Sequence, residues 1–129
     1  MKEGEKNRIL VVDDETNLVK AIEIRLKQAN YEVLTAGDGI EGLEKAKKER
    51  PDLILLDVLM PGMDGYQTLV ELKALDETKS IPVVMLTAKG QVEDVVTAQG
   101  MGADDYVVKP YNFIILLEKI RNLLNTKKR

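Results

Sequence analysis

Three aspartates stand where their carboxylates could act together. Asp13 and Asp14 directly follow the strand-like run Arg8–Val12, and Asp57 directly follows the apolar run Leu53–Leu56. The second run has no alternating polar residue, which is typical of a strand buried on both faces of a parallel sheet. In open sheets of this class, ligands bind at the edge formed by the carboxyl ends of the strands. The sequence therefore predicts that the three carboxylates converge on one rim.

Two further polar side chains are expected on the same rim. Thr87 follows the apolar run Pro82–Leu86, and Lys109 follows the run Asp105–Val108. Paired carboxylates repel each other, so a cationic group is expected among them. Oxygen ligands without imidazole or thiolate favour a hard ion, and Mg²⁺ suits a site that keeps several waters. One Mg²⁺ and Lys109 would balance the three carboxylates, and the neutral site could then accept a phosphoryl group.

Each of these residues also has a plain structural explanation. Asp57 and Asp13 could cap the turns that follow them, because aspartate often does so. Thr87 could be an ordinary residue at a strand end, and Lys109 could be solvated. A second adjacent acid, Asp14, exceeds what capping needs, and it is the combination of residues that favours a functional site.

The composition of the chain narrows the chemistry. It has 129 residues, no cysteine and no histidine. Disulfides, thiol catalysis, an imidazole base and a typical zinc site are therefore excluded. The net charge of −3 does not imply a nucleic-acid surface, and no apolar run approaches the roughly 20 residues of a membrane span. We expect a cytoplasmic protein with no direct nucleic-acid partner and no membrane partner.

Five strand patterns alternate with five helix patterns along the chain. This alternation predicts an α/β fold in which helices cover both faces of a doubly wound parallel sheet. Thr16 or Asn17 should cap the first helix, and Asn112 should cap the last. A single domain at 8–125 would lie between a flexible tail at 1–7 and a polar tail at 126–129. The expected strands are 8–12, 32–36, 53–56, 82–86 and 105–108, and the expected helices are about 16–29, 40–49, 65–75, 92–99 and 113–125.

The first and last helices carry apolar residues outside the stripe expected to face the core. Ile24 lies opposite the core stripe of the first helix, and Ile114 and Ile115 fall away from that of the last. Exposed single apolar residues are normal, whereas a joint patch would indicate a docking surface. In the first helix the inner face is expected to hold Leu18, Ile22, Leu26 and Ala29, with Val19 at its margin.

Together these motifs make the chain similar to the receiver domain of two-component response regulators. In plan it most resembles stand-alone, chemotaxis-type receivers. The resemblance covers nearly all of residues 8–124 and implies a flavodoxin-like, five-stranded sheet in the order 2-1-3-4-5. The motifs occur in family order and spacing: Val-Asp13-Asp14-Glu, Asp57-Val-Leu-Met-Pro-Gly-Met-Asp-Gly65, Leu-Thr87-Ala88, Gly102-Ala-Asp-Asp-Tyr106 and Lys109-Pro110.

The resemblance implies a phosphorylation-activated signalling switch and not an enzyme that turns over a separate substrate. Asp57 would be the nucleophile that takes a phosphoryl group from a phosphohistidine of a sensor histidine kinase or a phosphotransfer protein. Lys109 and Thr87 would contact the phosphoryl oxygens, and the Lys109–Pro110 bond is expected to be cis. The ion, Mg²⁺ or alternatively Mn²⁺, would be held by Asp13, Asp14, Asp57 and the backbone carbonyl of Leu59.

The family also implies a switch and partner surfaces. Tyr106 would change position as Thr87 engages the phosphoryl group, and the change would control a downstream effector protein or a phosphorylation-dependent homodimer. An apolar Leu59 near the phosphoryl group should hinder the attacking water, so Leu59→Asn should speed dephosphorylation. The kinase would dock at the start of the first helix and the loop after the last strand, on Asn17, Leu18, Ala21, Pro110, Tyr111 and Ile114.

Two alternative functions use the same residues. A Mg²⁺-dependent phosphatase acting through an aspartyl phosphate would need a substrate pocket, and a chain of this length leaves no long loop to build one. A pure interaction module that takes no phosphate would be expected to lack Asp57, Thr87 or Lys109, and all three are present.

Overall fold

A five-stranded parallel sheet forms the centre of the molecule. The structure is a computed structural model, which describes residues 6–58, 64–87, 100, 102–109 and 111–127. The strand order is β2-β1-β3-β4-β5, which confirms the expected order, and all neighbouring strands pair in parallel. The strands are β1 (Arg8–Val12), β2 (Glu32–Ala36), β3 (Leu53–Asp57), β4 (Val83–Thr87) and β5 (Asp105–Val108).

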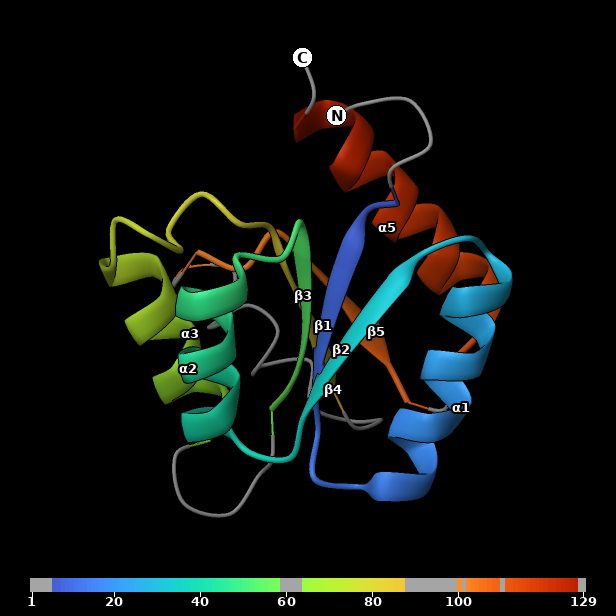
Figure 1. Cartoon of the computed structure of the whole chain (residues 1–129), viewed down its shortest axis with the longest axis horizontal. Helices are drawn as coiled ribbons and strands as arrows, with labels where there is room; N and C mark the ends of the chain where they lie inside the picture. The colour runs from blue at the N-terminus through green and yellow to red at the C-terminus, as the bar shows by residue number, and fades with distance from the viewer. Residues whose placement is uncertain (1–5, 59–63, 88–99, 101, 110, 128–129) are drawn as a thin grey trace.

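Helices cover both faces of this sheet, as predicted. In Figure 1, α1 and α5 lie on one side of the strands and α2 and α3 lie on the other. The expected helix at 92–99 falls outside the described residues, so the described part of the chain contains four helices. Their bounds are α1 (Thr16–Gln28), α2 (Gly39–Glu49), α3 (Gly65–Ala74) and α5 (Phe113–Lys127).

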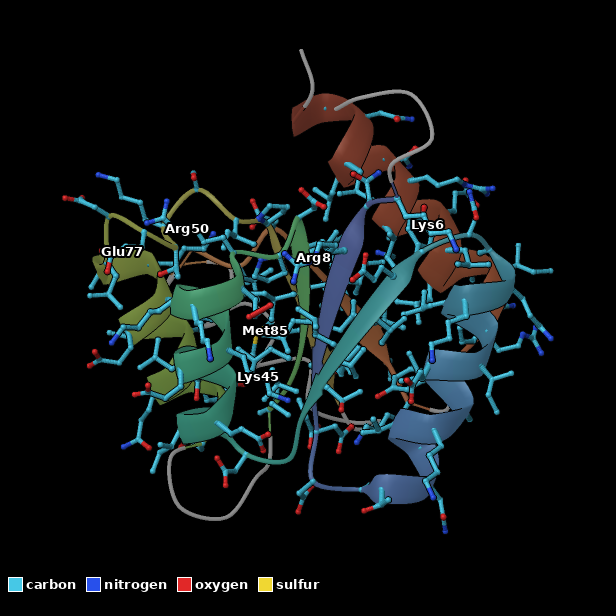
Figure 2. The ribbon with its side chains drawn as sticks, viewed as in Figure 1. Lys6, Arg8, Lys45, Arg50, Glu77 and Met85 are labelled. Atoms are coloured by element: carbon cyan, nitrogen blue, oxygen red, sulfur yellow. The ribbon has the colours of Figure 1, made fainter. Side chains whose placement is uncertain are left out.

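Alternating residues of each strand pack into two separate apolar layers, one on each face of the sheet. In β3, Leu53 and Leu55 pack toward α1 and α5, whereas Ile54 and Leu56 pack toward α2 and α3. All four side chains are fully buried, which explains why the run contains no polar residue. Figure 2 shows Met85 of β4 directed from the sheet into the layer beneath α2 and α3.

Side-chain caps fix where most of the helices begin. Asp38 accepts a hydrogen bond from the backbone N–H of Glu41 at the start of α2. Asp64 and Gln67 form a reciprocal capping box at the start of α3. Asn112 Oδ1 accepts from the N–H groups of Ile114 (3.0 Å) and Ile115 (3.2 Å), which confirms the predicted cap of α5.

The first helix differs from the prediction in its cap and its inner face. Its N-cap residue is Glu15, without a side-chain hydrogen bond, so neither Thr16 nor Asn17 caps it. The backbone N–H of Glu15 instead donates to Asp13 Oδ1, which ties the helix start to the preceding strand. Val19 is buried while Leu18 is only partly buried and Ala29 is exposed, so the inner face runs through Val19, Ile22 and Leu26 at the spacing i, i+3, i+7.

Candidate functional site

Strand alternation decides which side chains meet at the carboxyl ends of the strands. The backbone N–H of Asp13 continues the β1 ladder by donating to Ala36, and the N–H of Lys109 continues the β5 ladder by donating to Thr87. Side chains two residues apart in a strand share a face. Val11, Leu55 and Val107 pack toward α1 and α5. The side chains two positions later, Asp13, Asp57 and Lys109, therefore lie on the same face of the sheet.

These three side chains form a charged cluster at one rim. The ammonium of Lys109 lies 3.2 Å from Asp57 Oδ1 and 3.7 Å from Asp13 Oδ2. Both carboxylates are almost completely buried, and the other oxygen of Asp13 accepts the Glu15 N–H at 3.0 Å. The structure thus places Lys109 beside both Asp57 and Asp13, on the rim where these residues were expected to converge.

Burial and mutual repulsion shift the acidity of this cluster. Burial, with repulsion from Asp13 as the next cause, raises the pKa of Asp57 to about 6. Burial also raises the pKa of Asp13, although its hydrogen bond from Glu15 opposes the change. Burial by itself would lower the pKa of Lys109, but Asp57 and Asp13 outweigh it and raise that pKa. Lys109 is therefore a fixed cation beside two carboxylates that are costly to keep charged.

The acidic side chains fit a hard divalent cation. Carboxylate oxygens of Asp13, Asp14 and Asp57 all lie within 4.8 Å of one another. Oxygen-only donors at this spacing suit Mg²⁺, and the repulsion that raises the pKa of Asp57 is the repulsion that a cation would relieve. Asp14 is exposed, so the cluster is open to solvent on its side. Leu59, whose carbonyl was the remaining expected ligand, lies outside the described residues.

Thr87 lies on the other face of the sheet. It follows Val83 and Met85 of β4, which pack toward α2 and α3, and it is 1% exposed. Its hydroxyl has no hydrogen-bond partner in the described part of the chain. Tyr106 is paired with Met85 across β4 and β5, and it packs against the same apolar layer. The two expected switch residues therefore share one face of neighbouring strands.

The first residue of α3, Gly65, packs closely against the end of β3. The N–H of Gly65 donates to the carbonyl of Val58 at 2.9 Å. A Cβ on Gly65 would lie 2.1 Å from the backbone oxygen of Asp57 and 2.7 Å from the Cα of Val58. Only glycine permits this approach, so the sequence signal Asp57…Gly65 marks a contact that fixes the backbone of the candidate nucleophile.

The described residues that are expected to dock a partner lie on α1, on α5 and just before α5. Asn17 and Ala21 are exposed and Leu18 is partly buried on α1, while Ile114 on α5 is 72% exposed. Both helices cover the same face of the sheet (Figure 1). Pro110 lies outside the described residues, and with it the Lys109–Pro110 bond. Tyr111 is partly exposed, and its hydroxyl is buried.

The sequence matches one protein family over most of its length. Residues 9–121 match the response regulator receiver domain. The chain belongs to this family. It is 48% identical over 119 residues to the probable transcriptional regulator ycf27 of Cyanophora paradoxa, and the match covers 92% of this receiver and 48% of the relative. It is 44% identical over 105 residues to the alkaline phosphatase synthesis transcriptional regulatory protein PhoP of Bacillus subtilis, and the match covers 81% of this receiver and 43% of the relative.

Solved structures of receivers have the same fold. A putative response regulator from Chloroflexus aurantiacus superimposes with a TM-score of 0.90 at 35% identity, covering 94% of this receiver and 99% of that chain. The Vibrio cholerae chemotaxis protein CheY4 superimposes with a TM-score of 0.86 at 34% identity, and the match covers 92% of this receiver and 99% of that chain. The receiver spans about half the length of the curated relatives it matches. Among the described residues, no helix is long and apolar enough to cross a bilayer.

Proposed function

We propose that this receiver domain is a switch that accepts a phosphoryl group on Asp57. The observation that carries the proposal is the placement of Asp57: a buried carboxylate, 3.2 Å from the ammonium of Lys109 and within 4.8 Å of the acidic pair Asp13 and Asp14. A carboxylate is already a nucleophile, so no general base is required. That agrees with a chain that contains no histidine.

The phosphoryl donor is a phosphohistidine of a sensor histidine kinase or of a phosphotransfer protein. An oxygen of Asp57 forms a bond to phosphorus, and the bond from phosphorus to the imidazole nitrogen breaks. The imidazole leaves with the electron pair and takes up a proton, and Asp57 becomes an acyl phosphate. Lys109 turns from the Asp57 carboxylate to the new phosphoryl oxygens and neutralises part of their charge. Catalysis is then mainly positioning and charge neutralisation.

Asp13, Asp14 and Asp57 would hold Mg²⁺, or Mn²⁺ in its place, with the backbone carbonyl of Leu59 as a further ligand. The ion supplies positive charge for the phosphoryl oxygens and relieves the repulsion among the carboxylates. The oxygen-only ligand set and the raised pKa of Asp57 support this assignment.

Thr87 and Tyr106 form the switch. The buried Thr87 hydroxyl has no partner among the described residues and is free to donate to a phosphoryl oxygen. Movement of Thr87 changes the packing on the face that it shares with Tyr106. Phosphorylation thereby alters the β4–β5 surface, which binds a downstream effector or a second copy of the receiver. Because the curated relatives are transcriptional regulators of about twice the length, we propose an output of that kind.

The kinase docks where α1 and α5 begin, on the surface that includes Asn17, Leu18, Ala21 and Ile114. The exposure of Ile114 supports this, since a large exposed apolar residue next to a functional rim suits a transient interface. Pro110 and Tyr111 complete the proposed surface. The protein would act in the cytoplasm, where such kinases present their phosphohistidine.

Intact mass tests the central step. The protein is incubated with acetyl phosphate, with Mg²⁺ or with EDTA, and Asp57→Asn serves as the control. We expect a Mg²⁺-dependent gain of one phosphoryl group that is absent in the variant. If the wild-type protein gains no phosphoryl group under any condition, the receiver is an interaction module, and the roles proposed for Asp57, Thr87 and Lys109 are all refuted.

A further inference from the structure

Tyr111 lies between two residues whose positions are fixed. Before it, Lys109 donates its backbone N–H to Thr87 at 2.7 Å and places its ammonium 3.2 Å from Asp57. After it, Asn112 caps α5. The ring of Tyr111 packs against the apolar layer between the sheet and helices α1 and α5. This is the face on which Asp13 and Asp57 leave their strands.

The hydroxyl of Tyr111 is buried and has no hydrogen-bond partner in the described part of the chain. Leaving a phenol hydroxyl buried and unpaired is unfavourable, and such a group in a native structure calls for an explanation. Asp13 Oδ2 is in the same condition, with only the ion pair to Lys109 at 3.7 Å beside it. A buried donor and a buried acceptor thus stand unpaired on the same face of the same rim.

The charges around Tyr111 keep it a donor. Burial raises the pKa of the Tyr111 hydroxyl, and the carboxylates of Asp13, Asp57 and Glu15 raise it further. Tyr111 therefore keeps its hydroxyl hydrogen at neutral pH and can donate it. A phenylalanine would pack the same ring against the same layer but would supply no donor.

We propose that Tyr111 is a positioning residue for Asp13: its hydroxyl donates to Asp13 Oδ2 when that carboxylate binds a divalent cation. This inference rests on the proposed function, in which Asp13 is one of the ligands of the cation. Hydrogen bonds of this kind orient a ligating carboxylate, and their removal weakens metal affinity. Tyr111 thereby helps to set the Mg²⁺ concentration at which the switch works.

Tyr111→Phe tests the inference, with Tyr31→Phe as the matched control. Tyr31 packs against the same apolar layer but precedes β2, at the opposite end of the sheet. Mg²⁺ binding is titrated by NMR, and the melting temperature is measured in EDTA. We expect the dissociation constant for Mg²⁺ to rise about tenfold in Tyr111→Phe. It should stay unchanged in Tyr31→Phe, and the metal-free melting temperature of Tyr111→Phe should be unchanged or higher.

An unchanged Mg²⁺ dissociation constant in Tyr111→Phe overturns the inference. An equal loss of affinity in both variants also overturns it, because it would reflect a general loosening of the apolar layer. Phosphorylation of the wild-type protein by acetyl phosphate is measured alongside. Failure of that reaction removes the proposed function, whereas normal phosphorylation with equal Mg²⁺ affinities removes only the role of Tyr111.

Discussion

Asp57 carries an unfavourable charge in the metal-free protein. Burial and repulsion raise its pKa to about 6, from an ordinary value of 3.8. The folded protein therefore holds this proton more tightly than the unfolded chain does. Protonated Asp57 therefore favours the folded state. This contribution is fully present below about pH 4 and is lost as the pH rises through 6, so at neutral pH the charged Asp57 lowers the free energy of unfolding by about 1–3 kcal/mol. Reactivity toward a phosphoryl donor and cost to stability have the same origin.

Asp57→Asn should accordingly stabilise the metal-free protein. In EDTA at pH 7.5, the free energy of unfolding should rise by about 1–3 kcal/mol, and the gain should disappear near pH 4. Urea denaturation at a series of pH values measures it. Asp76→Asn is the control, because Asp76 is highly exposed and pairs with Lys79 at the surface. Equal or lower stability of Asp57→Asn at pH 7.5 would contradict the expectation.

A substitution at Thr87 should leave phosphorylation of Asp57 intact and block the movement of Tyr106 that follows it. Thr87→Val keeps the shape of the buried side chain and removes an unpaired hydroxyl, so metal-free stability should change by less than about 1 kcal/mol. Acetyl phosphate should still phosphorylate Asp57, but the ring signals of Tyr106 should no longer shift. Selective labelling of tyrosine for NMR measures both states. A normal Tyr106 shift in the variant would refute the coupling of the two residues.

At the scale of elements, the start of α3 packs against the backbone of Asp57 at the end of β3. Gly65→Ala would place a methyl carbon against the Asp57 carbonyl, and that carbonyl cannot move without disturbing β3. We expect a loss of about 1–3 kcal/mol in the free energy of unfolding, together with slower phosphorylation. Gly100→Ala is the control, because a Cβ there meets no atom within 4 Å. Chemical denaturation and intact mass measure the two effects.

Lys119 of α5 contacts two residues of β5, Asp105 and Tyr106. Lys119 Nζ lies 2.8 Å from Asp105 Oδ1 and 5.1 Å from the centre of the Tyr106 ring. Lys119→Met should lower the free energy of unfolding by about 1 kcal/mol, because both contacts are partly exposed. It should also loosen the Tyr106 ring, seen as faster ring flipping by NMR. Lys119→Arg retains the charge and should behave like the wild-type protein, and equal ring dynamics in all three would exclude this restraint.

At the scale of the whole molecule, the apolar runs and their turns were enough to predict the sheet and its helical layers. Strand order came from the resemblance, because periodicity does not specify which strands are neighbours. The cap of α1 was predicted wrongly. Its N-cap is Glu15, and the backbone N–H of Glu15 donates to Asp13 Oδ1, which is the turn-capping role that the sequence allowed for Asp13. Lys109 was expected on the same rim as the acids, but its distances to Asp57 and Asp13 and the burial of the Tyr111 hydroxyl could not be predicted, because they depend on side-chain positions across several strands.

Ion pairs lie at both ends of the sheet, but the three-carboxylate cluster that could hold a cation lies at the carboxyl end, which yields a test on the whole fold. At the amino end, Arg8 pairs with Glu49 at 2.9 Å and lies near Glu32 (3.8 Å), and Figure 2 shows it at the end of β1. At the carboxyl end, acids outnumber the lysine. A cation bound only by the folded state adds about 2.7 kcal/mol at a hundred times its dissociation constant.

Mg²⁺ should therefore raise the melting temperature of the wild-type receiver, and more strongly at pH 7.5 than at pH 5, where Asp57 is largely protonated. Asp13→Asn should abolish most of the effect. Glu49→Gln removes the ion pair at the other end and should lower the melting temperature equally with and without Mg²⁺. If Mg²⁺ stabilised Asp13→Asn as much as the wild-type protein, the cation would bind elsewhere, and the acidic rim would have lost its assigned role.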